Sequence, residues 1–152
     1  MRTSSILIWM VIGVAPSRSA VAADDMGCDP NGPCEDECVY FKNGVTFHNT
    51  GNGPLIRYEG RVHKLKWVSE RVTKMDPVAE LPGHTTETTF KGDGLKVVLK
   101  QVVIENGCYY KDENGKYAEV GTECNGINEM TLVISKKVGR SQTLKATWRV
   151  GC

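Results

Sequence analysis

The segment EMTLVISKKVGRSQTLKATWRV, residues 129–150, decides the fold. Apolar and polar residues alternate with period two in both of its halves, which is the pattern of a strand with one buried face. The stretch around Gly139, between the halves, is suited to a turn. We therefore predict an antiparallel hairpin with these residues facing the core: Met130, Leu132, Ile134, Leu144, Ala146, Trp148 and Val150.

Turn signals divide the rest of the chain into further short strands. Asn-Gly, whose residues tolerate the positive φ of tight hairpin turns, occurs six times. Residues 95–104 are apolar on both faces, which is typical of a central strand. Residues 54–72 also read as strand, and their apolar phase reverses near His63 and Lys64, where we expect a bulge or bend.

These patterns together predict an all-β domain. We expect a small antiparallel barrel or sandwich of about seven strands, stapled by three disulfides. A helical turn could form only between Ser69 and Leu81, where Pro77 and Pro82 would keep it short.

The first 22 residues have the layout of a secretory signal peptide. Arg2 precedes an apolar run, and Ala20-Val21-Ala22 fits the small-x-small rule for cleavage. The apolar run is about ten residues long, whereas a bilayer takes about twenty to cross. We predict cleavage after Ala22 and one secreted domain over 23–152, extracellular or periplasmic, with no membrane anchor.

Charge divides unevenly along the predicted mature chain. Of 19 Lys and Arg, two (Arg2 and Arg18) leave with the signal peptide, which gives 17 basic and 18 acidic side chains. Six of the acids precede Lys42 with no base among them, so the remainder holds 12 acids and 17 bases. An acidic segment, 23–41, therefore precedes a mildly basic body. This balance argues against nucleic acid as a partner, because nucleic-acid-binding domains are usually far more basic.

All six cysteines follow the predicted signal peptide, and an even number in an exported chain indicates disulfides. Cys108 and Cys124 flank a segment centred on Asn114-Gly115, so a hairpin there would bring them together. A bond from Cys152 to Cys28, Cys34 or Cys38 would tie the two ends of the domain together.

The acidic segment CDPNGPCEDEC, residues 28–38, could instead hold a metal. Zinc would need a fourth ligand, and the segment has neither a Cys-x-x-Cys pair nor a nearby histidine. Calcium would find oxygen ligands here, but their spacing does not match a helix-loop-helix calcium loop. We therefore expect no metal site, and an exposed, disulfide-pinned loop whose candidate binding residues are Asp29, Glu35, Asp36 and Glu37.

One group of residues has the chemistry for phosphoryl transfer. On a continuous strand, Arg57, Glu59, Arg61 and His63 would share one face. Glu59 could then act as general base and His63 as general acid, with the arginines holding a phosphate. The simpler interpretation is a solvated outer face with alternating charges, on which Arg57, Glu59 and Arg61 are candidates for binding.

Other candidate groups are weaker. The histidines His48, His63 and His84 lack metal-ligand spacing, and no serine lies in a Gly-x-Ser-x-Gly elbow. Two further sets depend on the fold. Basic residues at alternate strand positions could form a stripe, and aromatic residues could line a ligand cavity. These are Lys96, Lys100, Lys145 and Arg149 for the stripe, and Trp67, Trp148, Tyr109, Tyr110 and Tyr117 for the cavity.

We conclude from the sequence that the chain acts by binding and needs no cofactor. The leading hypothesis is an inhibitor, effector or immunity-type protein directed at another exported protein, since the chain is rigidly stapled and rich in polar turns. One alternative is a small secreted phosphodiesterase or ribonuclease that uses Glu59, Arg61 and His63. The other is a carrier of a small apolar ligand.

Overall fold

The computed structural model describes residues 26–28, 38–50, 52–74, 81–119 and 125–150. The predicted signal peptide and most of the acidic segment lie outside these residues. The part of the chain that is described is all-β, with one short 3-10 element, η1 (Lys42–Gly44). None of its helices is long and apolar enough to cross a membrane.

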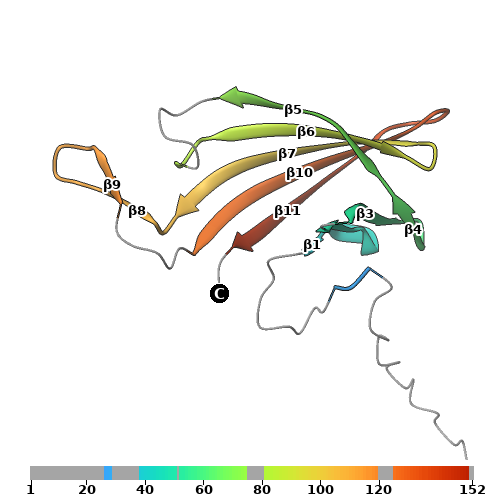
Figure 1. Ribbon diagram of the computed structural model, residues 1–152, viewed down its shortest axis with the longest axis horizontal. Coiled ribbons are helices and arrows are strands. Elements are labelled where there is room, and N and C mark those ends of the chain that lie inside the picture. Colours follow the sequence, from blue (N-terminus) through green and yellow to red (C-terminus); the bar gives the residue numbers. More distant parts are fainter. Residues whose placement is uncertain (1–25, 29–37, 51, 75–80, 120–124, 151–152) are drawn as a thin grey trace, which may run out of the picture.

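The larger of two main sheets has five antiparallel strands in the order β11-β10-β7-β6-β5 (Figure 1). The predicted hairpin is confirmed, because Leu132 of β10 pairs with Leu144 of β11. The apolar segment 95–104 is central, as predicted, since β7 lies between β10 and β6. The strands are β5 (Lys66–Lys74), β6 (Thr85–Gly92), β7 (Leu95–Asn106), β10 (Gly126–Lys136) and β11 (Gln142–Val150).

The smaller sheet has four antiparallel strands in chain order, β1-β2-β3-β4. A third, two-stranded ribbon of β8 and β9 extends from the end of the larger sheet (Figure 1). The described residues thus form eleven strands where about seven were predicted, because several are too short for their alternation to be seen in the sequence. The remaining bounds are β1 (Cys38–Tyr40), β2 (Thr46–Thr50), β3 (Gly53–Tyr58), β4 (Arg61–Lys64), β8 (Tyr109–Lys111) and β9 (Tyr117–Glu119).

The prediction of a continuous strand over 54–72 is wrong. The chain turns back at Glu59 and Gly60, which have φ of 51° and 73° and join β3 to β4 in a tight hairpin. This left-handed pair of conformations matches the twist of the flanking strands. The chain then passes to the larger sheet at Leu65, close to the predicted bend. The helical turn proposed for 69–81 is also wrong over its first half, where β5 continues to Lys74, and 75–80 lie outside the described residues.

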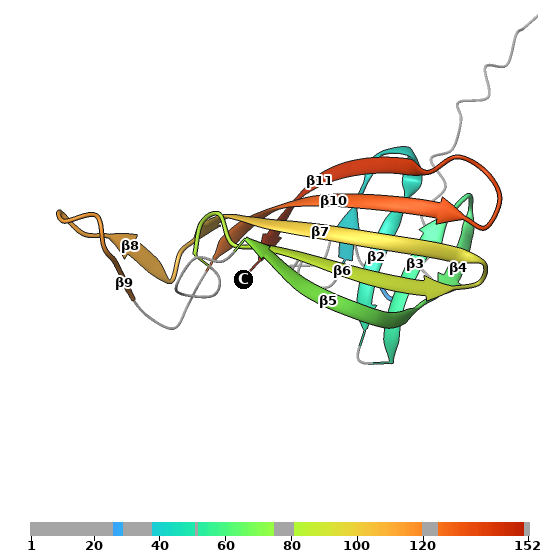
Figure 2. The same cartoon turned by 90° about the horizontal axis from the view of Figure 1, so that it is seen from above.

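The two sheets pack face to face around one apolar core. Strands of the smaller sheet run steeply across those of the larger one and cover only part of its inner face (Figure 2). The sheets are not closed into a barrel, so that alternative is wrong. Apolar residues of both sheets form the core, including Phe47, Ile56, Tyr58, Phe90, Val97, Leu99, Met130, Leu132 and Ile134.

A disulfide joins Cys28 to Cys38 beside the smaller sheet. These cysteines pack with Met26 in a second apolar cluster against Leu55 and Val62. Because Cys28 and Cys38 bond to each other, neither can be the predicted partner of Cys152. Cys108 is also disulfide-bonded. The predicted pair of Cys108 with Cys124, and the remaining predicted pairing of Cys152, with Cys34, involve cysteines outside the described residues.

Candidate functional site

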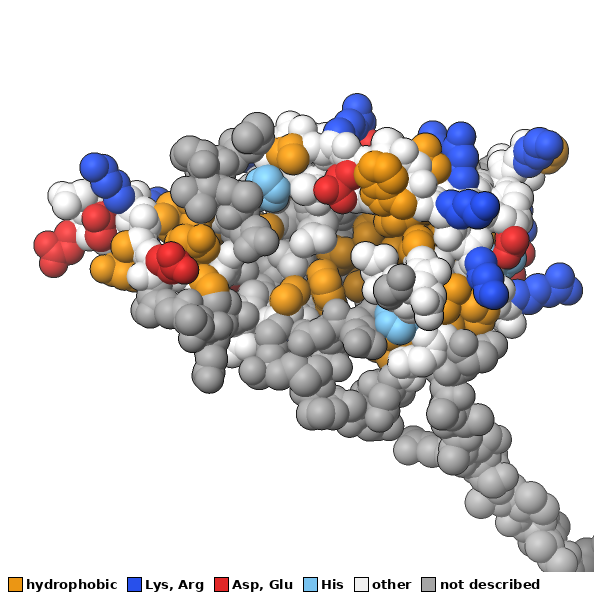
Figure 3. All heavy atoms as spheres, in the orientation of Figure 1, with side chains coloured by type: hydrophobic (Ala, Val, Ile, Leu, Met, Phe, Trp, Pro, Cys, Tyr) orange, Lys and Arg blue, Asp and Glu red, His pale blue; other side chains and the backbone are white. Residues whose placement is uncertain are grey.

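A hollow opens on the inner face of the larger sheet where the smaller sheet ends. Its volume is about 390 Å³, and it is walled by strands of both sheets. Figure 3 shows apolar side chains within the depression between the sheets. We call it the tryptophan hollow; it is lined by Val39, Phe47, Asn49, Pro54, Trp67, Glu70, Thr86, Thr88, Phe90, Leu99, Gln101, Met130 and Trp148.

Strand register explains why these side chains meet. Directly opposed residues of antiparallel strands point to the same face. Trp67 of β5 lies opposite the buried Phe90, and Glu70 lies opposite Thr88. Because Phe90 belongs to the core, all four side chains lie on the inner face. β5 is the edge strand of its sheet and is exposed along its whole length, with bulges beside Trp67 and Val72.

Both tryptophans of the predicted mature chain line this hollow. The chain has three tryptophans, and Trp9 belongs to the predicted signal peptide. Trp148 is partly buried and packs against the core, whereas Trp67 is 60% exposed at the rim. Tryptophan has a large apolar surface, so leaving it exposed to water is unfavourable. Exposed tryptophans are nevertheless enriched at binding surfaces.

Polar side chains stand among the apolar walls of the hollow, and one pair of them is joined by a hydrogen bond. The hydroxyl of Thr88, a buried residue, donates a hydrogen bond of 2.9 Å to a carboxylate oxygen of Glu70. Glu70 is the one charged residue among the described lining residues. Ligand sites commonly combine apolar and aromatic walls with polar groups placed to orient the ligand, and this hollow has both. Sequence reasoning missed Glu70, Thr88 and Gln101, although a threonine two residues from Phe90 on the same face was a signal.

A second hollow of about 530 Å³ adjoins the first and shares Gln101 and Trp148 with it. Glu105 and the buried Asn128 also contribute to its lining. The aromatic residues expected in a cavity therefore separate into two groups. Trp67 and Trp148 line a hollow, while Tyr109, Tyr110 and Tyr117 belong to the β8–β9 ribbon.

The structure brings Glu59, Arg61 and His63 together at a different place. They lie with Asp93 and Lys136 around a recess between the β3–β4, β6–β7 and β10–β11 turns. Arg57 does not join them. It pairs with Val62, on the opposite face of the sheet from the pairs Tyr58–Arg61 and Ile56–His63. The hairpin at Glu59 and Gly60 is the reason, because it puts the four residues on two strands and a turn.

Contacts within this recess do not suit the acid-base roles considered for it. Lys136 donates to both carboxylate oxygens of Glu59, each at 2.7 Å. The hydrogen bond from Lys136 holds the pKa of Glu59 below its ordinary value, which makes this carboxylate a weaker base. His63 Nδ1 lies 3.9 Å from a carboxylate oxygen of Asp93. That same oxygen accepts a hydrogen bond of 3.1 Å from the backbone N–H of Lys64, so Asp93 serves the turn itself.

The other candidate groups have simple structural surroundings. His48 is buried, and its Nδ1 hydrogen-bonds the carbonyl of Met26 at 2.6 Å. It lies close to Cys28 and Cys38, but the sulfurs of these cysteines are joined in a disulfide and are not thiolate ligands. The candidate binding residues of the acidic loop, Asp29, Glu35, Asp36 and Glu37, lie outside the described residues.

The proposed basic stripe is interrupted. Strands β7 and β11, which carry its four residues, are not neighbours, because β10 lies between them. Lys100 and Lys145 both lie opposite Thr131 and thus flank it on the outer face.

Comparison with family models, with curated proteins and with solved structures finds no match to this chain.

Proposed function

We propose that this chain is an exported binding protein and that the tryptophan hollow is its binding site. In this proposal the partner is another exported protein, which the chain inhibits or modifies by binding. The observation that carries the proposal is that both tryptophans of the predicted mature chain line one hollow, one of them largely exposed.

Surroundings of the hollow support a partner larger than a small molecule. Val68 and Val72 of β5 are exposed near Trp67, so apolar surface continues outward from the rim. β5 is the edge strand of the larger sheet, with no neighbour on its other side among the described strands. A partner protein could insert an apolar side chain into the hollow and contact this strand with its backbone.

A pull-down tests this proposal. The bait is the oxidised protein, purified from the export compartment after expression of the full chain. It is incubated with matched extracellular or periplasmic extract and compared with a Trp67→Ala bait and a Tyr110→Ala control, an exposed aromatic on the ribbon. We expect one stoichiometric partner on the unaltered bait and on the control, with most of it lost from Trp67→Ala. A partner retained equally by all three baits would contradict the proposed site.

A second candidate function is transport of a small apolar ligand. Its specific support is the volume of about 390 Å³, within the range of small-molecule sites, about 300–1,000 Å³. Organic extraction of the purified protein, followed by mass spectrometry, would reveal a ligand in the unaltered protein that is depleted in Trp67→Ala. An empty extract, together with a retained protein in the pull-down, would favour the first proposal.

A further inference from the structure

Three lysines lie side by side across the outer face of the larger sheet. Lys66 of β5 is directly opposite Lys91 of β6, and Lys91 is directly opposite Lys96 of β7. All three side chains are exposed. They point away from the smaller sheet, because their neighbours Phe90 and Leu95 face the core on the other side. We call these three residues the lysine row.

Two hydroxyl groups continue the lysine row to the far edge of the sheet. Ser135 of β10 lies opposite Lys96, and its hydroxyl is 2.9 Å from that of Ser141, just before β11. A bond between two hydroxyls uses one hydrogen, so the other remains able to donate to a ligand. The lysines and Ser135 lie on four neighbouring strands and Ser141 lies just before the fifth, a span of about 19 Å at the usual strand spacing.

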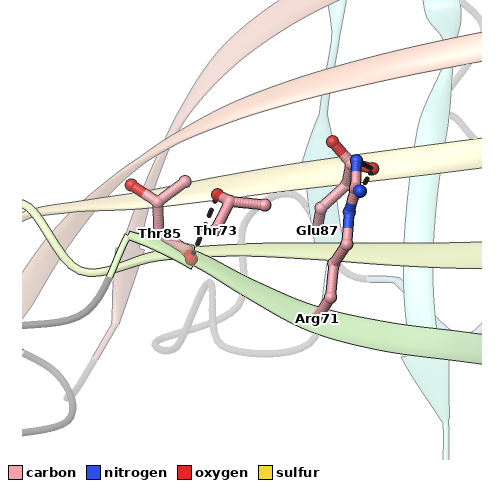
Figure 4. A network of polar contacts seen from close by, with 4 residues as sticks. All are labelled: Arg71, Thr73, Thr85 and Glu87. Atoms are coloured by element: carbon pink, nitrogen blue, oxygen red, sulfur yellow. Dashed lines mark hydrogen bonds and ion pairs between the residues drawn. The ribbon is translucent and has the colours of Figure 1, made fainter.

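Another row on the same face is balanced. Arg71, Glu87 and Lys100 lie opposite one another on β5, β6 and β7, with the single acid in the middle. Arg71 Nη2 is 2.7 Å from Glu87 Oε1, and its Nε donates to the same oxygen (Figure 4). Opposite charges at facing positions stabilise a sheet, and like charges there destabilise it.

Within the described part of the chain, the lysine row has no such compensation. None of its three lysines forms an ion pair with any residue that the structure describes. The acid at the same hairpin, Asp93, is engaged by the backbone of Lys64. More generally, basic side chains gather at this end of the molecule, around the β6–β7 and β10–β11 turns (Figure 3). Repulsion within the lysine row would be relieved by an anionic ligand laid across the strands.

We infer that the lysine row, with Ser135 and Ser141, binds a linear sulfated polysaccharide. Lysine supplies a compact point charge on a flexible stem, without the planar fork by which arginine binds an anion in two-bond pairs, and this suits anionic groups spaced along a polymer. A linear row across four strands and the adjoining turn fits a linear polymer better than a single small anion. The site goes beyond the proposed function, because it lies on the face opposite the tryptophan hollow and needs none of its residues.

Heparin is the probe for this inference. Its binding to the oxidised protein is measured by calorimetry at low and at physiological salt. The test variant is Lys66→Gln/Lys91→Gln/Lys96→Gln. The control is Lys42→Gln/Lys74→Gln/Lys116→Gln, which removes the same charge from exposed positions elsewhere. Each lysine near an anionic surface contributes about fivefold to affinity, so we expect the test variant to bind about 100-fold more weakly. The control keeps affinity within a few-fold, and salt weakens binding of the unaltered protein.

Thermal unfolding gives a second readout that does not depend on loss of binding. Heparin is expected to raise the Tm of the unaltered protein and of the control, and to leave the Tm of the test variant unchanged. Equal heparin affinity in the two triple variants would overturn the site. Absence of heparin binding at low salt would overturn the ligand class, as would equal or tighter binding of polyglutamate or single-stranded DNA of matched charge.

Discussion

The two faces of the five-stranded sheet differ in how they use the same strands. On the inner face, apolar residues from alternate positions form the core until the smaller sheet ends, and beyond that point Trp67, Phe90 and Trp148 are left around a hollow. On the outer face, charged residues occupy the intervening positions, balanced in one row and unbalanced in the lysine row. Strand alternation therefore determines which residues share a face, and the extent of the covering sheet determines which of them can reach a partner.

The largest difference in the free energy of unfolding is expected between alanine variants of two neighbouring residues of β10 that lie on opposite faces. Leu132 is fully buried on the inner face, whereas Val133 is half-buried on the outer face. We expect Leu132→Ala to lower the free energy of unfolding by about 2–5 kcal/mol, because it leaves a cavity. Val133→Ala should cost clearly less. Chemical denaturation of both variants measures this difference, and equal losses would contradict the assignment of the two faces.

The next largest loss of stability is expected from a substitution where the chain crosses from one sheet to the other. A side chain on Gly92 would collide with the backbone of Lys64 and Leu65, where β4 passes into β5. We expect Gly92→Ala to lower the free energy of unfolding by about 1–3 kcal/mol, since the crossing must move apart. Thr89→Ala, on the outer face of the same strand, is the control for denaturation. An unchanged free energy of unfolding in Gly92→Ala would show that Gly92 does not lie this close to the backbone of Lys64 and Leu65.

Single charge changes should separate the two rows on the outer face. Lys91 has a lysine on either side, so Lys91→Gln is expected to raise the free energy of unfolding by about 0.2–1 kcal/mol. Lys100→Gln removes a charge opposite Glu87 and should leave stability unchanged or lower it by a similar amount. Denaturation at low salt measures both. Both effects should shrink at high salt, and the same sign for the two variants would contradict the contrast between the rows.

The smallest effect is expected at the exposed pair of Glu59 and Lys136. The hydrogen bond from Lys136 lowers the pKa of Glu59, so the pair contributes stability above the ordinary pKa of glutamate and loses it as pH falls through the lowered folded value. NMR titration of the carboxyl group should show a lowered pKa that returns to its ordinary value in Lys136→Met. A titration unaffected by that substitution would mean that the pair does not form in solution.

Local pattern predicted much of this fold from the sequence. The hairpin over 129–150 follows from apolar alternation, and the central position of 95–104 follows from apolar residues on both of its faces. The β3–β4 hairpin was missed because its turn is Glu59-Gly60, with no Asn-Gly signal and only two residues between the strands. For this reason we assigned Arg57, Glu59, Arg61 and His63 to one continuous strand. In the structure they lie on two strands and the turn between them.

The candidate site could be predicted only in part. Trp67 and Trp148 were identified as possible cavity residues, but they are far apart in the chain. Their meeting depends on the strand order β11-β10-β7-β6-β5 and on where the smaller sheet ends. The alternation of apolar residues within a strand does not predict which strands will be neighbours. The cysteines show the same limit, because spacing alone did not indicate that Cys28 pairs with Cys38.

The most direct test of the central claim uses the two tryptophans as reporters of the tryptophan hollow. The neutral fluorophore N-phenyl-1-naphthylamine is titrated into the oxidised protein while tryptophan emission is recorded. We predict saturable one-to-one binding with energy transfer from tryptophan to the bound probe, weakened at least about tenfold in Trp67→Ala, where Trp148 still reports, and unchanged in Tyr110→Ala. Absence of saturable quenching, or equal affinity in Trp67→Ala, would show that the hollow does not bind an apolar group.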